Sequence, residues 1–118
     1  DSVYGFISLP KLVWEFIDTP HFQRLRHIKQ LGCLSWVFPG AMHSRFEHSL
    51  GTGYLAQKYI TTIIEKQDGI VSISDEAIFT VTLAGVLHDI GHGPYSHLFD
   101  SQVVKYIYSR DLDEVDRN

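Results

Sequence analysis

The sequence has few cysteines, no long apolar run and no excess of positive charge. Cys33 is its single cysteine, so no internal disulfide can form, which is compatible with a reducing compartment. The longest nearly apolar run, residues 77–87, is far shorter than the roughly 20 residues that cross a bilayer. A net charge of −4 argues against nucleic-acid or membrane binding by bulk electrostatics. We therefore expect an intracellular protein, nuclear or cytoplasmic, with no membrane partner and no indicated nucleic-acid partner.

Several common catalytic patterns are also missing. The sequence contains no H-E-x-x-H helix, no G-x-S-x-G turn, no phosphate-binding P-loop and no CxxC pair. Its hydrophobic content of 44% and charged content of 20% are ordinary for a globular protein. Without repeats or linkers, the 118 residues are expected to form a single domain.

Helical periodicity dominates and predicts a mostly α fold. The expected helices are 11–18, 19–32, 44–69, 74–89 and 95–110. Thr19 is predicted to cap the second of them, while Ser44 and Glu47 form a capping box for the third. Only residues 4–9 and 34–38 look strand-like.

The segment GVLHDIGHGPYSH, residues 85–97, holds three histidines and an aspartate among mostly apolar neighbours. Burying Asp89 there is costly unless it is paired or binds a cation. Because the helix is expected to end near Gly91, His88 and Asp89 could both reach one ion. His48, on the 44–69 helix, is the third candidate ligand. Mixed histidine and carboxylate ligands favour Fe, Mn, Zn, Ni or Mg.

Small residues accompany both histidines and favour close approach of the two helices. They are Gly51 and Gly53 after His48, and Ala84 and Gly85 before His88. The alternative for either histidine alone is a hydrogen-bonded core residue.

Other polar groups surround these candidates in the sequence. Arg45 shares a helix face with His48 and opposes the helix dipole, which indicates anion binding; the alternative is an exposed arginine held by Glu47. Asp100, three residues after His97, could hydrogen-bond its ring and make it a general acid, or the two could form a surface pair.

Three stretches, DTPHFQRLRHIKQLG, VFPGAMHSRFEHSLGTGYLA and AGVLHDIGHGPYSHLFD, resemble the core of the HD-domain dNTP triphosphohydrolases. The resemblance covers residues 1–100. It implies a helical HD fold, a divalent metal cofactor and hydrolysis of a dNTP to deoxynucleoside and triphosphate. The segment VFPGAMHSRFEHSLG argues against another HD phosphohydrolase specificity.

The resemblance also assigns roles by position. It implies a metal site, groups near the α-phosphate, substrate contacts and an activator site. The implied metal ligands are His48, His88 and Asp89, and the implied catalytic groups are His92, His97 and Asp100. The implied substrate contacts are Arg45, Gln30 and Leu31, and the implied activator-site residues are Asp18 and Arg26. The family pattern further implies a GTP or dNTP activator and a homo-oligomer.

The sequence departs from the family pattern at both ends. Tyr4 and Phe6 stand where histidines are usual, which weakens the activator-site assignment. The family's later catalytic histidine and fourth metal-binding aspartate have no counterpart, and Asp111, Asp113 and Asp116 lie outside any motif. We therefore expect 1–118 to be a single partial HD domain, truncated at its C-terminal side. The alternative function is a non-catalytic truncated paralogue or fragment that binds nucleotide or full-length subunits.

Overall fold

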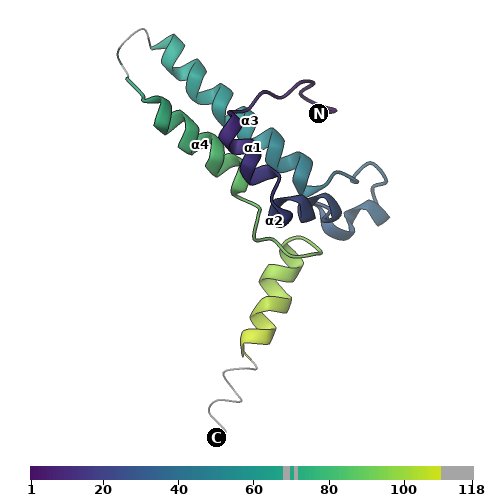
Figure 1. The fold of residues 1–118 in the computed structure, drawn as a ribbon. Helices are drawn as coiled ribbons and strands as arrows, with labels where there is room; N and C mark the ends of the chain where they lie inside the picture. Colours follow the sequence, from purple (N-terminus) through teal and green to yellow (C-terminus); the bar gives the residue numbers. More distant parts are fainter. Residues whose placement is uncertain (68–69, 71, 110–118) are drawn as a thin grey trace, which may run out of the picture.

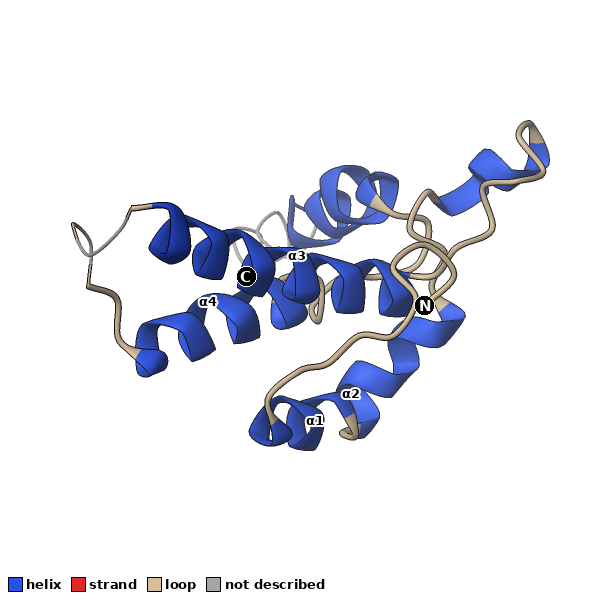
Figure 2. Ribbon diagram, turned by 90° about the horizontal axis from the view of Figure 1, so that it is seen from above, coloured by secondary structure: helices blue, strands red, loops and turns tan. Residues whose placement is uncertain are grey.

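The computed structural model describes residues 1–67, 70 and 72–109, and helices are its regular elements. No strand occurs among these residues, and the β-pairing there is an isolated bridge between Lys29 and Ser44 (Figure 2). The α-helices are α1 (Lys11–Ile17), α2 (Pro20–Gln23), α3 (Arg45–Lys66) and α4 (Asp75–Leu87). Two 3-10 helices, η1 (Arg24–His27) and η2 (Gly32–Trp36), and a π-helix, η3 (Phe99–Val104), complete the set. The predicted mostly α fold is confirmed.

An antiparallel pair of helices, α3 and α4, forms the centre of the molecule (Figure 1). The predicted capping box starts α3: the Ser44 hydroxyl accepts from the Glu47 amide at 3.3 Å, and the Glu47 carboxylate accepts from the Ser44 amide at 2.9 Å. Ser74 caps α4 by accepting from the amide of Ala77 at 3.2 Å. Both helix starts are therefore as predicted.

Glycines let α3 and α4 approach closely. A Cβ atom on Gly53 would lie 2.3 Å from Cγ2 of Val86, and one on Gly85 would lie 3.1 Å from Cα of Gly53. Gly51 does not contribute to the contact between α3 and α4. A Cβ atom on Gly51 would instead lie 2.8 Å from the ring of Tyr4. The predicted close contact is thus correct for Gly53 and Gly85 and wrong for Gly51.

The hydrophobic core lies where α3 begins and α4 ends. Helix α1 contributes Val13 and Ile17, and Phe22 of α2 packs edge-on against Phe46 of α3 with ring centroids 5.4 Å apart. Val86, near the end of α4, is completely buried in the same cluster. The core therefore anchors the end of the helix pair that carries the candidate site.

The predicted helix over 19–32 is wrong beyond its first turns. Thr19 caps α2 as expected, accepting from the amide of Phe22 at 3.3 Å, but α2 ends at Gln23 and η1 at His27. The chain then becomes extended at Ile28, whose carbonyl accepts from the amide of Arg45 at 2.8 Å. Pairing with the residues just before α3 thus replaces the helical hydrogen bonds.

The remaining differences concern short segments. Residues 34–36, expected as strand, belong to the 3-10 helix η2, and residues 4–9 are irregular. Helical structure near the C-terminus starts at 97 instead of 95. The expected helix ends at Gly69 and Arg110, and the tail aspartates, lie outside the described residues. No helix in the described part of the chain is long and apolar enough to span a membrane.

Candidate metal centre

Three predicted ligands meet at the end of the α3–α4 pair. The Nε2 atoms of His48 and His88 lie 3.1 Å apart. The Asp89 carboxylate closes the group, with Oδ1 3.3 Å from Nε2 of His88 and Oδ2 3.7 Å from Nε2 of His48. The structure therefore brings together the residues that the sequence analysis placed around one ion.

The spacing of these atoms fits a metal ion. Ligand atoms about 2.1 Å from a cation lie about 3.0 Å apart at right angles and about 3.4 Å apart in a tetrahedron. The separations of 3.1 and 3.3 Å lie between these values, and the third, 3.7 Å, is slightly longer. Two imidazoles and a carboxylate are also a donor set that divalent transition metals prefer.

Helix termination explains how adjacent residues share one site. Helix α4 ends at Leu87, so His88 is its C-cap and Asp89 begins the following turn. Nδ1 of His88 lies 2.7 Å from the carbonyl oxygen of Gly85. Because a carbonyl can only accept, Nδ1 carries the proton and Nε2 offers its lone pair to the site.

Asp89 is buried and paired with Arg45. The two residues are 4% and 2% exposed, and Nη1 of Arg45 donates to Oδ2 of Asp89 at 2.6 Å. This contact confirms the expectation that a buried Asp89 needs a partner. The alternative of an exposed Arg45 held by Glu47 is wrong, because Glu47 is used in the capping box.

Burial lowers the pKa of His48 below its ordinary value of 6.5. The Asp89 carboxylate partly opposes this shift, whereas the nearby rings of His88 and His43 and the guanidinium of Arg45 reinforce it. The ring of His48 is therefore held in its neutral form, which is the form that binds metals.

We expect the His48 ring of the metal-free chain to titrate with a midpoint below 6.5, followed by the NMR shift of its Cε1 proton. The unfolded chain protonates first, so this group stabilises the fold above pH 6.5, and that contribution is lost as the pH falls through the depressed folded pKa. Asp89→Asn, which removes the opposing carboxylate, should lower the midpoint further. A midpoint above 6.5 in the unaltered chain would contradict this account.

The second predicted group, His92, His97 and Asp100, lies next to the first. Nε2 of His92 is 3.5 Å from Oδ1 of Asp89, and the ring of His97 packs edge-on against that of His92 with centroids 5.2 Å apart. Asp100 hydrogen-bonds Nδ1 of His92, so the expected pairing of Asp100 with His97 is wrong. A carboxylate oxygen of Asp100 still lies within 4.8 Å of a ring nitrogen of His97, so the three side chains form one cluster.

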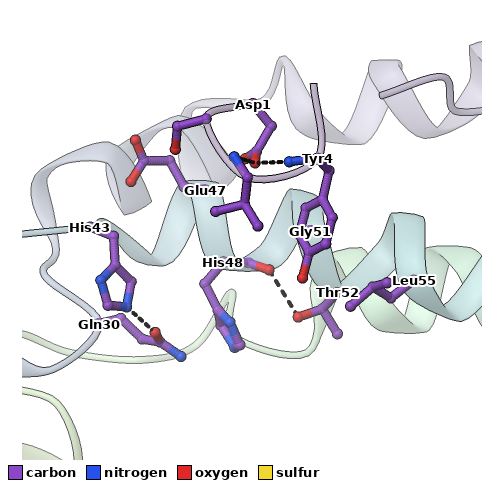
Figure 3. A pocket seen from close by; sticks show the side chains of 11 residues that line it. Asp1, Tyr4, Gln30, His43, Glu47, His48, Gly51, Thr52 and Leu55 are labelled. Carbon is purple, nitrogen blue, oxygen red and sulfur yellow. Dashed lines mark hydrogen bonds between the residues drawn. The ribbon is translucent and has the colours of Figure 1, made fainter. Parts of the chain in front are cut away.

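The other predicted residues are divided between the site and the surface. Gln30 borders a cavity of about 320 Å³ beside His48 (Figure 3), and its side-chain oxygen bonds the ring of His43. Leu31 does not line this cavity. Asp18 and Arg26 are exposed, and the Arg26 guanidinium lies 3.6 Å from the centre of the Phe46 ring.

Two residues at the site were missed by the sequence analysis. His43 contacts Gln30 from the turn before α3, and Ser96 accepts from Nη2 of Arg45 at 3.0 Å. Ser96 lies 51 positions from Arg45, and no local pattern signals a contact of that kind. His43 could have been noticed as a histidine two residues before Arg45.

Comparison with known proteins identifies the family. The HD domain model matches residues 45–115, which include both clusters. The deoxynucleoside triphosphate triphosphohydrolase SAMHD1 is 52% identical over 104 residues in Bos taurus and in Homo sapiens, and its homologue in Dictyostelium discoideum is 50% identical over 103. These alignments cover 87–88% of the chain, which spans 16–20% of the relatives' length. The chain belongs to the HD domain family.

Proposed function

We propose that this chain carries part of the active site of a metal-dependent dNTP triphosphohydrolase. The observation that supports it most is the convergence of His48, His88 and Asp89 on one point, with a second histidine and aspartate group in contact with them. The similarity to SAMHD1 supports the dNTP as substrate. The proposed reaction converts dNTP and water into deoxynucleoside and triphosphate.

The proposed metal ligands are His48, His88 and Asp89. A divalent ion held by these residues would supply Lewis-acid polarisation of a phosphate oxygen and would lower the pKa of a bound water. Its identity among Fe, Mn, Zn, Ni and Mg stays open, since imidazole and carboxylate suit all of these ions. Arg45 holds Asp89 in place and brings a positive charge to the edge of the site, where it can also contact a phosphate.

His92, His97 and Asp100 are the proposed catalytic groups. Asp100 orients the ring of His92 through Nδ1. His97 is exposed and can reach a bound substrate, so it is the proposed proton donor to the leaving deoxynucleoside oxygen. Nε2 of His92 lies 3.5 Å from Oδ1 of Asp89 and the ring of His97 packs against that of His92, so both rings lie close to the proposed metal ligands.

The remaining proposed contacts are those to the deoxyribose of the substrate and to an activating nucleotide. Gln30 and Leu31 are proposed to line the deoxyribose site; the cavity beside Gln30 supports the first. A GTP or dNTP activator is proposed at Asp18 and Arg26, whose exposure leaves them accessible in a homo-oligomer. A nuclear or cytoplasmic location stays a prediction.

The proposal is tested by incubating the chain with mixed dNTPs, Mn²⁺ and GTP and analysing the products by mass spectrometry. We expect inorganic triphosphate and free deoxynucleosides in equal amounts, and no product from His88→Ala. Glu65→Ala, which alters an exposed carboxylate on α3, serves as the matched control and should retain the activity. Turnover that survives His88→Ala would overturn the proposed metal role, whereas an unaltered chain without product would favour the second candidate function, binding without turnover.

The second candidate function is nucleotide or subunit binding without turnover. Large apolar side chains at the end of η2 and directly after it are exposed, with Trp36 at 87%, Val37 at 72% and Phe38 at 60%, which is typical of an association surface. In that case dNTP affinity should persist in the absence of metal and fall in Arg26→Ala or Arg45→Ala. Affinity that is unchanged by both substitutions would exclude it.

A further inference from the structure

A tight corner lies within the second cluster of the site, between His92 and His97. Tyr95 and Ser96 have φ angles of +64° and +57°, which place two consecutive residues other than glycine in the left-handed region. That conformation is unfavourable for side chains with a Cβ atom and persists where surrounding contacts impose it. The corner lies directly before His97 and leads into η3, which carries Asp100.

Close contacts fix this corner on both sides. Gly32 approaches the backbone of Tyr95 so closely that a Cβ atom on Gly32 would lie 3.0 Å from the Tyr95 carbonyl carbon. The ring of Phe99 covers Gly93, at 2.3 Å from a Cβ atom built there. These contacts restrict the backbone on either side of Ser96, although neither of them reaches the metal ligands.

The hydroxyl of Ser96 makes the connection to the metal ligands. Nη2 of Arg45 donates to Oγ of Ser96 at 3.0 Å while Nη1 of the same guanidinium donates to Oδ2 of Asp89 at 2.6 Å. Because the guanidinium is planar and rigid, fixing its two nitrogens fixes the distance between Ser96 and Asp89. Arg45 is 2% exposed, so water competes little for these bonds.

We propose that Ser96 is a positioning residue, whose hydroxyl bond to Arg45 holds the left-handed corner and thereby sets His92 and Asp100 in register with Asp89. The chain from Ser96 runs through one helical turn to Asp100, and the Asp100 carboxylate holds the ring of His92. His92 in turn presents Nε2 at 3.5 Å from Oδ1 of Asp89. Loss of the Ser96 hydroxyl would free the corner and loosen the bond between His92 and Asp100.

The inference rests on the proposed function only in giving the cluster of His92, His97 and Asp100 a catalytic use. Its test does not require dNTP hydrolysis. The readout is the hydrogen-bonded Nδ1 proton of His92 in the NMR spectrum of the full chain, assigned by its loss in His92→Gln. We expect this proton to exchange with water at least about tenfold faster in Ser96→Ala than in the unaltered chain, since local opening controls such exchange. If Ser96 only stabilised the fold, its replacement would lower the free energy of unfolding without changing the exchange of this proton.

Three further variants make the test decisive. Ser96→Gly removes the hydroxyl but adopts the left-handed conformation without strain, so it should fold and still show the faster exchange. Ser96→Asn tolerates the same conformation, offers a side-chain acceptor and should restore slow exchange. Ser101→Ala removes a hydroxyl that bonds the His97 carbonyl at 2.6 Å and should leave the exchange unchanged. Slow exchange in both Ser96→Ala and Ser96→Gly would overturn the inference whether or not the chain hydrolyses dNTPs.

Discussion

Asp89→Ala is expected to lower the free energy of unfolding by about 3–5 kcal/mol and to abolish Mn²⁺ binding in the micromolar range. The loss of stability follows because the substitution leaves the guanidinium of Arg45, 2% exposed, without its carboxylate partner. The loss of metal binding follows because only the two imidazoles of the three proposed ligands remain. Urea unfolding of the metal-free chain and isothermal titration with Mn²⁺ measure the two effects separately.

A double variant separates the two effects of Asp89→Ala. In Arg45→Met with Asp89→Leu, both charges are replaced by apolar groups, so most of the lost stability should return while metal binding stays absent. Glu65→Ala, on the exposed part of α3, is the matched carboxylate control and should change stability by less than about 0.5 kcal/mol. Micromolar Mn²⁺ affinity in Asp89→Ala would show that the ion is bound elsewhere.

Gly85→Val is expected to destabilise the fold by about 1–3 kcal/mol through overpacking. A Cβ atom at Gly85 would lie 3.1 Å from Cα of Gly53 and 3.2 Å from the carbonyl oxygen of Thr52, and backbone atoms of α3 cannot rotate away. The helices must therefore move apart, which also separates Nε2 of His48 from Nε2 of His88, now 3.1 Å apart. We expect Mn²⁺ affinity to fall by about 10–100-fold, as for other disturbances of ligand orientation.

The control for this substitution is Gly40→Val. Gly40 lies in the turn before α3 with negative φ, and no atom lies within 4 Å of a Cβ built on it. The substitution therefore adds the same isopropyl group without a clash at Cβ, and both stability and metal affinity should stay close to those of the unaltered chain. Equal Mn²⁺ affinities for Gly85→Val and Gly40→Val would contradict a metal site that depends on the spacing of α3 and α4.

Local sequence signals predicted the parts of the site that depend on helix ends and on small residues. The capping box at Ser44 placed the start of α3 correctly, and the small residues correctly indicated the contact of Gly53 with Gly85. The position of Asp89 at the end of α4 was predictable because helix-stopping residues follow it within a few positions. The cost of burying an aspartate also predicted that it would be paired.

Long-range contacts account for what the sequence did not reveal. Arg45, expected to meet anions or Glu47, is the partner of Asp89 at a separation of 44 positions. Pairing of Lys29 with Ser44 ended the helix that periodicity predicted over 19–32. Asp100 bonds His92, eight positions earlier, although a spacing of three residues had predicted a bond to His97.

The coordination of a bound ion tests the central claim most directly. X-ray absorption at the metal edge of the Mn²⁺- or Zn²⁺-loaded chain reports which atoms surround the ion. The account predicts two imidazole nitrogens and at least one carboxylate oxygen at about 2.0–2.2 Å, and the loss of one imidazole in His48→Ala and in His88→Ala. A sulfur ligand from Cys33, or an unchanged coordination shell in both variants, would contradict a metal site built from His48, His88 and Asp89.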